Sequence, residues 1–511
     1  MLALIAAVRV RLLHFSLERD EGEYAYAGQL LLEGIPPYQL AYNMKFPGTY
    51  AAYALIMAVF GQTPAGIHLG VTCVTTLTAL LLYWLGRRLL DGIAGVGMAT
   101  TYAVLAASPS LQGLSGHATH FAALFTTAGL CLLWIEMKRP AWSGFAAGAM
   151  FGLALLMKQH AVFFCVWGFL FLAALTLRQK QIPLRKRLQI PGSFCLGTAL
   201  PLAMTCLFLW RMGVLDKFWL WTIRYARDYV SELPLQAALP LFRHSIKAVM
   251  WKDGLTWAVA GAGLGLVWLD PRWRGRRWGL AGFALAAFLT VCPGFFFRTH
   301  YYLLMLPAVG LLAGCALSAA CRLPRGEPRE IRPRWWPVSV YALILAVNFL
   351  QNAPVWFTLT SVEASRLLYF RNPFVEAEQV AAFIRTNSPA DARVAVLGSE
   401  PEIYFLSHRR SATGYIYTYP LMEPQPFARH MQLDMIREIE SAQPEFVVLV
   451  FVKSSWLVQP DSARDLLDWW EQSYQKNYEL CRVVPLTETD ETGRLLVYKR
   501  RTAGEKTQVE H

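Results

Sequence analysis

Residues 301–320 read YYLLMLPAVGLLAGCALSAA, a run of twenty residues that contains no charged side chain. A helix of this length and composition is long enough to cross the roughly 30 Å hydrocarbon core of a membrane. Similar apolar runs recur along most of the chain. The sequence therefore predicts a polytopic membrane protein.

The composition supports the same class. Of the 511 residues, 55% are apolar and only 16% are charged, and the mean hydropathy is +0.33, far from an average soluble domain. Working outward from residues 301–320, we predict about eleven spans, near 1–14, 64–86, 91–109, 117–136, 143–157, 161–177, 192–211, 254–269, 278–294, 301–320 and 336–357.

The first predicted span is short and contains Arg9 and Arg11. Either the chain starts late in this helix, or the helix is short and its arginines reach back to the interface. We favour a truncated start. A cleaved signal peptide is disfavoured, because no small-residue cleavage site precedes Arg19 and Asp20.

Basic residues collect on alternate connections between the spans, and such loops tend to stay cytoplasmic. These connections hold Arg87 and Arg88, Lys138 and Arg139, the 178–187 loop with Lys180, the 272–277 loop and the 322–334 loop. The net charge of +13 is thus a topology signal and an attraction to anionic lipids. Nucleic-acid binding is not expected, because the charges are scattered over short turns.

The opposite, non-cytoplasmic side then receives the segment 15–63, the loop 212–253 and everything after 358. We expect a multi-span catalytic domain over 1–358, a linker over 359–374, a soluble α/β domain over 375–500 and a flexible tail over 501–511. The soluble domain is predicted from strand-length apolar runs at 394–397 and 446–451, separated by amphipathic stretches near 375–386, 427–441 and 460–474. Its alternating elements favour a partly parallel sheet. The fold class is therefore mainly α with a small C-terminal α/β domain.

Three acids, Asp20, Glu21 and Glu23, follow the first span on the predicted outer side. A hydrated acidic loop would explain them without any function. The next segment argues for more, because Lys45-Phe46-Pro47-Gly48 places a lone cation and a turn before an apolar stretch that ends at Phe60. That stretch suits a helix lying at the membrane interface.

The sequence resembles the glycosyltransferase C superfamily. The resemblance rests on the order of four features: the acidic pair, the Lys-x-Pro-Gly-x-Tyr segment, the turn Arg298-Thr299-His300 and the outer α/β domain. The closest resemblance is to bacterial relatives of protein O-mannosyltransferases and of the aminoarabinose transferase that modifies lipid A. It implies transfer of a sugar from a polyprenyl-phosphate donor to an acceptor at the outer membrane face, with inversion. Here Phe46-Pro47 replaces the family's usual double proline.

The resemblance makes Asp20 the catalytic carboxylate, which can accept the proton of an acceptor hydroxyl. Glu21 would orient Asp20, hold a divalent cation or position the acceptor. Mg²⁺ or Mn²⁺ suits carboxylate oxygens, although two acids alone define no metal site.

The leaving lipid phosphate calls for cations. Lys45 matches the lysine of the family, and Arg298 and His300 lie at the outer end of a span. Lys158 is a further candidate phosphate ligand at another outer span end, where a lysine also serves simply to reach the interface.

Two histidines, His117 and His120, follow the third predicted span. Relatives in the family commonly carry an acid at the position of His120. The two histidines are candidates, with Glu23, for binding the acceptor or a metal; a satisfied polar cluster is the alternative. Weaker candidates for covering the donor are Tyr225, Arg227, Asp228 and Tyr229, together with Tyr415, Tyr417 and Tyr419, which alternation would place on one strand face.

A transporter or a flippase of lipid-linked sugars would also have many spans. A transporter should carry its polar residues midway along interrupted helices, whereas here they crowd the outer ends. The expected partners are the polyprenyl-phosphate-linked sugar, membrane lipids and a lipid, polysaccharide or protein acceptor, with no nucleic acid. The expected location is the plasma (inner) membrane, with the site facing the periplasm or exterior.

Overall fold

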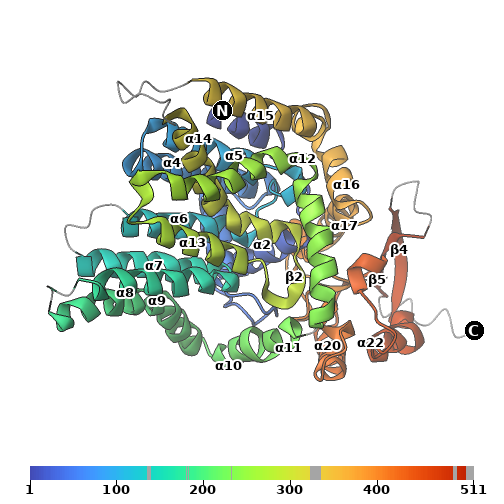
Figure 1. The fold of residues 1–511 in the computed structure, drawn as a ribbon. Helices are drawn as coiled ribbons and strands as arrows, with labels where there is room; N and C mark the ends of the chain where they lie inside the picture. The colour runs from blue at the N-terminus through green and yellow to red at the C-terminus, as the bar shows by residue number, and fades with distance from the viewer. Residues whose placement is uncertain are drawn as a thin grey trace, which may run out of the picture.

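The computed structural model describes residues 1–134, 140–179, 181, 183–231, 233–322, 335–486 and 492–501. The chain is mainly helical, and a small mixed sheet near the C-terminus lies at one end of the helical part (Figure 1). Of the basic loops used to predict orientation, Lys138, Arg139, Lys180 and the segment 323–334 lie outside the described residues, as does the tail after residue 501.

The helical part is built from helices of very different lengths. They are α1 (Leu2–Arg11), α2 (Arg19–Leu32), α3 (Gly48–Phe60), α4 (Pro64–Leu89), α5 (Gly92–Ala106), α6 (Ala118–Trp134), α7 (Pro140–Met157), α8 (Val162–Leu177), α9 (Leu184–Arg211), α10 (Leu215–Trp219), α11 (Ala226–Val230), α12 (Leu235–Leu269), α13 (Arg277–Leu289), α14 (Leu306–Arg322) and α15 (Trp336–Ala353).

Within the described ranges, six segments are long and apolar enough to cross a membrane, judged by length and composition: Pro64–Leu89, Pro140–Met157, Gln159–Leu177, Leu184–Arg211, Thr299–Arg322 and Trp336–Thr358. Four apolar helices are shorter: α3, α5, α6 and α13. The prediction of about eleven spans is therefore not confirmed. One reason is local: α5 ends at Ala106, shortly before Pro109, whose ring disfavours helix in the residue before it.

The segment 212–253 is mostly helical, where the sequence suggested a loop. It holds α10, the irregular turn η3 (Leu220–Tyr225), α11 and the first half of α12. The predicted span 254–269 is thus the second half of a helix of 35 residues (Figure 1).

Small residues set the distance between neighbouring helices. A side-chain carbon on Gly148 of α7 would lie 2.1 Å from the carbonyl oxygen of Phe194 in α9, so only glycine permits this approach. Close packing of this kind is typical of membrane helices, which have no hydrophobic effect to hold them together within lipid.

The C-terminal sheet has five strands in the order β2-β1-β3-β5-β4. They are β1 (Arg393–Leu397), β2 (Arg410–Ser411), β3 (Phe446–Phe451), β4 (Tyr478–Pro485) and β5 (Arg494–Arg500). β1 pairs in parallel with β2 and β3, whereas β5 pairs antiparallel with β3 and β4. This confirms the prediction of a partly parallel sheet.

Helices accompany the sheet: α16 (Ser361–Tyr369), α17 (Phe374–Asn387), α18 (Glu402–Ser407), α19 (Tyr419–Met422), α20 (Ala428–Ala442), α21 (Lys453–Trp456) and α22 (Asp465–Trp469). α17 and α20 coincide with two of the predicted amphipathic stretches. α16 lies in the segment predicted to be a linker. Its N-cap Thr360 and Glu363 form a capping box, which explains why a helix starts there.

The two parts of the chain meet at α2. A side-chain carbon on Gly22 would lie 2.6 Å from the backbone nitrogen of Glu402, so α2 packs directly against the start of α18. The first acidic segment of the chain is thus covered by a domain that follows it by nearly four hundred residues.

Candidate functional site

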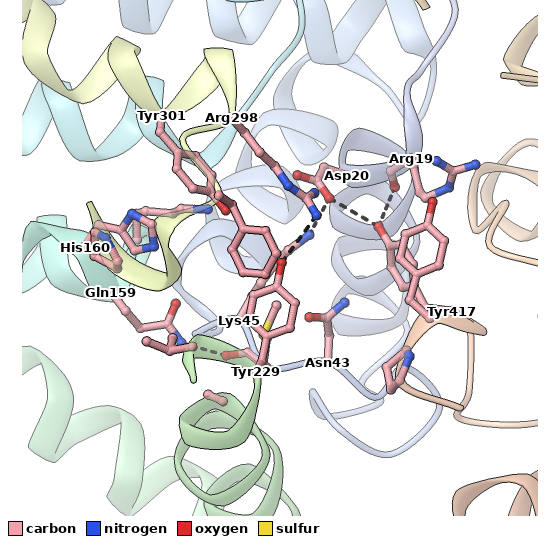
Figure 2. A pocket seen from close by; sticks show the side chains of 18 of the residues that line it. Arg19, Asp20, Asn43, Lys45, Gln159, His160, Tyr229, Arg298, Tyr301 and Tyr417 are labelled. Atoms are coloured by element: carbon pink, nitrogen blue, oxygen red, sulfur yellow. Dashed lines mark hydrogen bonds and ion pairs between the residues drawn. The ribbon is translucent and has the colours of Figure 1, made fainter. Parts of the chain in front are cut away.

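A cavity of about 890 Å³ lies where α2 meets the C-terminal domain. Its wall includes residues from stretches far apart in the chain, among them Glu18–Asp20, Asn43–Lys45, Lys158–His160, Arg298–Tyr301, and parts of the segments 221–231 and 417–423. Figure 2 shows Asp20, Lys45 and Arg298 directed toward one another from three of these stretches. Polar side chains far apart in sequence therefore share one space.

Asp20 reaches the cavity from the first turn of α2. The helix begins with a capping box, in which the Glu18 carboxylate accepts from the Glu21 backbone N–H at 3.1 Å. A carboxylate in the first helical turn is favoured by the helix dipole. Burial opposes ionisation of Asp20, but the adjacent Lys45 ammonium outweighs it and holds the pKa of Asp20 well below its usual range. Asp20 is therefore a carboxylate at neutral pH.

Lys45 bridges two acids of α2. Its Nζ lies 2.7 Å from Asp20 Oδ1 and 2.5 Å from Glu23 Oε2. Tyr50 Oη donates to the other oxygen of Glu23 at 2.5 Å. Burial opposes the charge on Lys45, yet Asp20 and Glu23 raise its pKa above the usual value. Lys45 is a permanent cation, and Glu23 serves as its second counter-ion.

Lys158 and Arg298 approach from the helical part. Lys158 lies between two candidate spans, with its Nζ 4.8 Å from the centre of the Tyr301 ring. Burial lowers the pKa of Lys158 to about 8. Arg298 Nη2 donates to Tyr229 Oη at 3.3 Å. Both residues line the same cavity as Asp20, as the sequence suggested.

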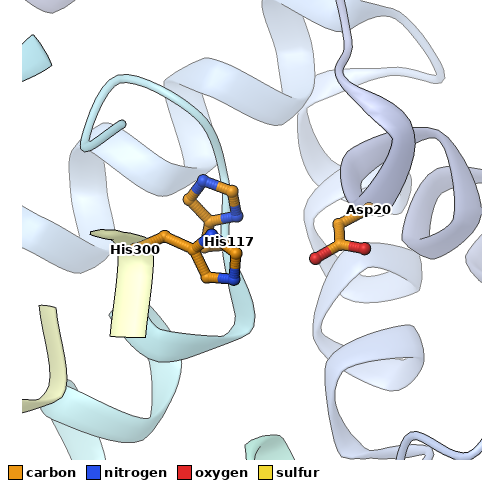
Figure 3. A group of neighbouring side chains, drawn as sticks. All are labelled: Asp20, His117 and His300. Carbon is orange, nitrogen blue, oxygen red and sulfur yellow. The ribbon is translucent and has the colours of Figure 1, made fainter. Parts of the chain in front are cut away.

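His117 and His300 stack against each other, with ring centres 4.4 Å apart and planes inclined by 14°. Their ring nitrogens and an Asp20 oxygen all lie within 4.8 Å of one another (Figure 3). Among the described residues, neither nitrogen of the buried His117 has a hydrogen-bond partner, although Nδ1 lies 3.5 Å from Glu18 Oε1. An imidazole without partners beside a carboxylate fits a divalent cation.

His120 lies elsewhere. It is buried in the first turn of α6, with Nε2 3.1 Å from the carbonyl oxygen of Gly113, and it does not line the cavity. Of the two histidines singled out in the sequence, His117 is thus the one that the fold brings to Asp20.

Glu21 is fully buried and also does not line the cavity. Its Oε1 lies 3.0 Å from His68 Nε2 of α4 and accepts from the Gly116 N–H at 2.5 Å. Burial opposes ionisation, but the paired His68 lowers the pKa of Glu21 below its usual value. Glu21 therefore ties α2 to α4 and to the segment before α6.

The weaker candidates divide in the same way. Tyr225, Arg227 and Tyr229 line the cavity, whereas Asp228 does not. Tyr415, Tyr417 and Tyr419 do not lie on one strand face, because residues 415–418 form no strand and Tyr419 begins α19. Tyr417 and Tyr419 line the cavity, while Tyr415 packs against Tyr42.

Arg19 was missed as a site residue, although it lines the cavity next to Asp20. Its adjacency to Asp20 was the only available signal. Tyr301 and Asn43 were also missed. Tyr301 directly follows His300, and Asn43 precedes Lys45 by two positions. Hydrophobic periodicity does not show where side chains point outside regular helices and strands.

Known proteins share part of this sequence and its overall fold. Residues 45–210 match the family described as dolichyl-phosphate-mannose-protein mannosyltransferase. ArnT from Cupriavidus metallidurans, solved bound to undecaprenyl phosphate, is 16% identical and superposes with a TM-score of 0.62 over 97% of this chain and 96% of ArnT. The apo form of ArnT gives 0.58 with the same identity and coverage. No curated protein matches the sequence.

The chain therefore shares the fold of ArnT, and the family match and the structural match together support the glycosyltransferase C superfamily. The resemblance predicted from the sequence is confirmed, and it extends to the aminoarabinose-transferase-like arrangement of helices and C-terminal domain. The matched family segment contains Lys45, His117 and Lys158.

Proposed function

We propose that this protein is an integral-membrane, inverting glycosyltransferase that moves a sugar from a polyprenyl-phosphate donor to an acceptor hydroxyl. The carrying observation is that one cavity of about 890 Å³ holds the Asp20 carboxylate and the cations Lys45, Lys158 and Arg298. Such a site offers a base for the acceptor and positive charge for the leaving group.

The base is Asp20. Bond formation at the anomeric carbon requires the acceptor hydroxyl to lose a proton, and a carboxylate fixed within reach can accept it. Asp20 is paired with Lys45 at 2.7 Å, which makes it a weak base before the donor binds. A donor phosphate beside Lys45 neutralises part of that charge and so makes Asp20 more basic once the donor is in place.

The cations hold the lipid phosphate. The phosphate gains negative charge as the glycosidic bond breaks, and preorganised cations stabilise that charge. Lys45 and Lys158 act as point charges, whereas the planar guanidinium of Arg298 can donate two parallel hydrogen bonds to phosphate oxygens. All three line the cavity wall.

A divalent cation fits Asp20, His117 and His300, whose ligand atoms lie within 4.8 Å of one another. Two imidazoles with one carboxylate favour Mn²⁺ or Zn²⁺ over Mg²⁺, which prefers oxygen ligands. When bound, such an ion would supply a further positive charge near the phosphate.

The site is proposed to face the non-cytoplasmic side of the plasma membrane. Its residues lie in segments that alternate along the chain with the basic connections, which are predicted to be cytoplasmic. The acceptor is a lipid, a polysaccharide or a protein that carries a hydroxyl. A flippase is the alternative, but it needs no carboxylate clustered with cations at one end of the helices.

The test uses the purified protein in liposomes with polyprenyl-phosphate-linked hexoses and pentoses and with envelope extracts as acceptors. We expect release of free polyprenyl phosphate together with sugar incorporated into the acceptor fraction. Movement of the lipid-linked sugar across the bilayer with no release of polyprenyl phosphate would contradict the proposal and favour the flippase. Protein carrying Asp216→Asn, a change of an exposed acid outside the cavity, is the matched control.

A further inference from the structure

Arg19 joins the start of α2 to the C-terminal domain. Its Nη2 donates to Glu400 Oε1 at 2.8 Å, its Nη1 lies 3.3 Å from Asn372 Oδ1, and its Nε donates to the Ser399 carbonyl oxygen. The guanidinium carbon also lies 5.4 Å and 5.3 Å from the ring centres of Phe374 and Tyr419. One side chain is thus held by three acceptors and two aromatic rings.

The Glu400 carboxylate that pairs with this guanidinium is held in place by other hydrogen bonds. The Glu400 side chain is fully buried, and its second oxygen accepts from the Ser399 N–H at 2.8 Å and from Ser455 Oγ at 2.6 Å. A buried carboxylate with every oxygen bonded has one fixed orientation. The anion that holds Arg19 is therefore itself immobile.

The contact lies at a special edge of the sheet. Ser399 and Glu400 follow the carboxyl end of β1, and Ser455 follows the carboxyl end of its parallel neighbour β3. In open α/β sheets, this edge is where ligands bind. Here it is occupied by a side chain of the helical part of the same protein.

Asp20 is the next residue along α2, and the domain touches it as well. Tyr417 Oη donates to the Arg19 carbonyl oxygen at 2.9 Å and lies 3.4 Å from Asp20 Oδ1 (Figure 2). The first turn of α2 therefore has the C-terminal domain on the Arg19 side and the cavity on the Asp20 side.

We propose that the C-terminal domain takes part in catalysis by positioning Asp20. The ion pair between Glu400 and Arg19 fixes the direction in which Asp20 presents its carboxylate to the substrate. The inference rests on the proposed function, because it assigns Asp20 the role of base. Arg19 and Glu400 are positioning residues. A displacement of about 1 Å in a reacting group lowers a rate by as much as about 100-fold.

The chain offers a matched control at the other end of the same helix. Arg410 Nη2 lies 2.8 Å from Glu33 Oε2, so this ion pair also joins α2 to the C-terminal domain. It is largely exposed and stands away from the cavity lining. Removing it changes the attachment of the two parts without touching the first turn of α2.

The experiment compares full-length Glu400→Gln, Arg19→Ala and Glu33→Gln in detergent or liposomes. We expect the first two to lower kcat about tenfold or more while KM for the donor changes less than about twofold, and Glu33→Gln to leave both unchanged. Millimolar guanidinium should restore part of the kcat of Arg19→Ala, because the aromatic and carboxylate site stays formed, while sodium chloride at equal ionic strength should not. Arg19→Lys, which keeps the charge but loses the planar fork, should not restore kcat and serves if Arg19→Ala does not fold.

Wild-type kcat in Glu400→Gln and Arg19→Ala would overturn the positioning proposal. An equal fall in kcat in Glu33→Gln would also overturn the proposal. So would a fall that guanidinium does not relieve and that follows a loss of folded protein, because either result would make the Arg19–Glu400 contact a purely structural one. Asp20→Asn separates the two proposals. If Asp20→Asn is inactive while Glu400→Gln is fully active, the proposed function stands without positioning. If Asp20→Asn is fully active, Asp20 is not the base and the positioning proposal fails with that assignment, whereas the proposed function fails only if the wild-type protein releases no polyprenyl phosphate from the donor.

Discussion

Lys45 Nζ lies 2.7 Å from Asp20 Oδ1, so the proposed base and the proposed phosphate ligand are in contact before any substrate is bound. Each offsets the charge of the other. A lipid phosphate that approaches Lys45 competes with Asp20 for the ammonium protons. The pair therefore links binding of the donor to activation of the base.

Replacing the ammonium should expose the dependence of both acids on it. Lys45→Met leaves Asp20 and the fully buried Glu23 without their cation. We expect a loss of about 3 kcal/mol in the free energy of unfolding, measured by thermal or denaturant unfolding in detergent, and loss of polyprenyl-phosphate binding. Lys217→Met, which removes an exposed lysine, is the control. Unchanged lipid binding in Lys45→Met would remove Lys45 from the phosphate site.

The alkaline side of the pH profile should report Lys158. Burial lowers the pKa of Lys158 to about 8, so its positive charge is present below that pH and is lost as pH rises through it. We expect kcat/KM for the donor to fall above about pH 8, since this parameter reports the free enzyme. Lys158→Arg should abolish this alkaline limb, because a guanidinium stays charged. An identical limb in Lys158→Arg would assign it to another group.

Metal content should depend on the stacked histidines. We expect His117→Ala and His300→Ala each to lower the affinity for Mn²⁺ or Zn²⁺ by about tenfold or more. The metal bound per protein is measured by elemental analysis after equilibrium dialysis. His430→Ala, at an exposed histidine of α20, should bind as the wild type does. If all three variants retain equal metal content, the ion does not sit between Asp20 and these rings.

Glu21 should behave as a structural residue. Glu21→Gln weakens the contact with His68 and the Gly116 N–H, and we expect it to reduce the free energy of unfolding by about 1–3 kcal/mol. The kcat of the folded fraction should stay within about threefold of wild type, because Glu21 faces away from the cavity. A large fall in kcat with unchanged stability would instead place Glu21 in the catalytic machinery.

The family resemblance and the predicted topology together identified part of this site. The resemblance singled out Asp20 and Lys45, and a position at the outer end of a predicted span supported Lys158, Arg298 and His300. The fold brings all five to one cavity. Glu21 was also expected to act at the site. One step along an α-helix turns a side chain by about 100°, and the Glu21 carboxylate contacts His68 and Gly116 and does not line the cavity.

Contacts over long sequence separation were not predictable from one chain. Arg19 meets Glu400, 381 residues later, because a buried loop after β1 places a carboxylate there, and no periodicity signals such a partner. The count of about eleven spans is not confirmed, and for a different reason. Hydropathy detects α5 and α13, but it does not show that these helices are only 15 and 13 residues long.

The most direct measurement is sugar transfer by Asp20→Asn, with polyprenyl-phosphate binding measured on the same preparation. The substitution keeps the size of the side chain but removes its ability to accept a proton. We predict that transfer falls about 1,000-fold or more while the folded protein still binds the lipid phosphate. A transfer rate equal to wild type, in protein with unchanged folding and lipid binding, would contradict the assignment of Asp20 as the base.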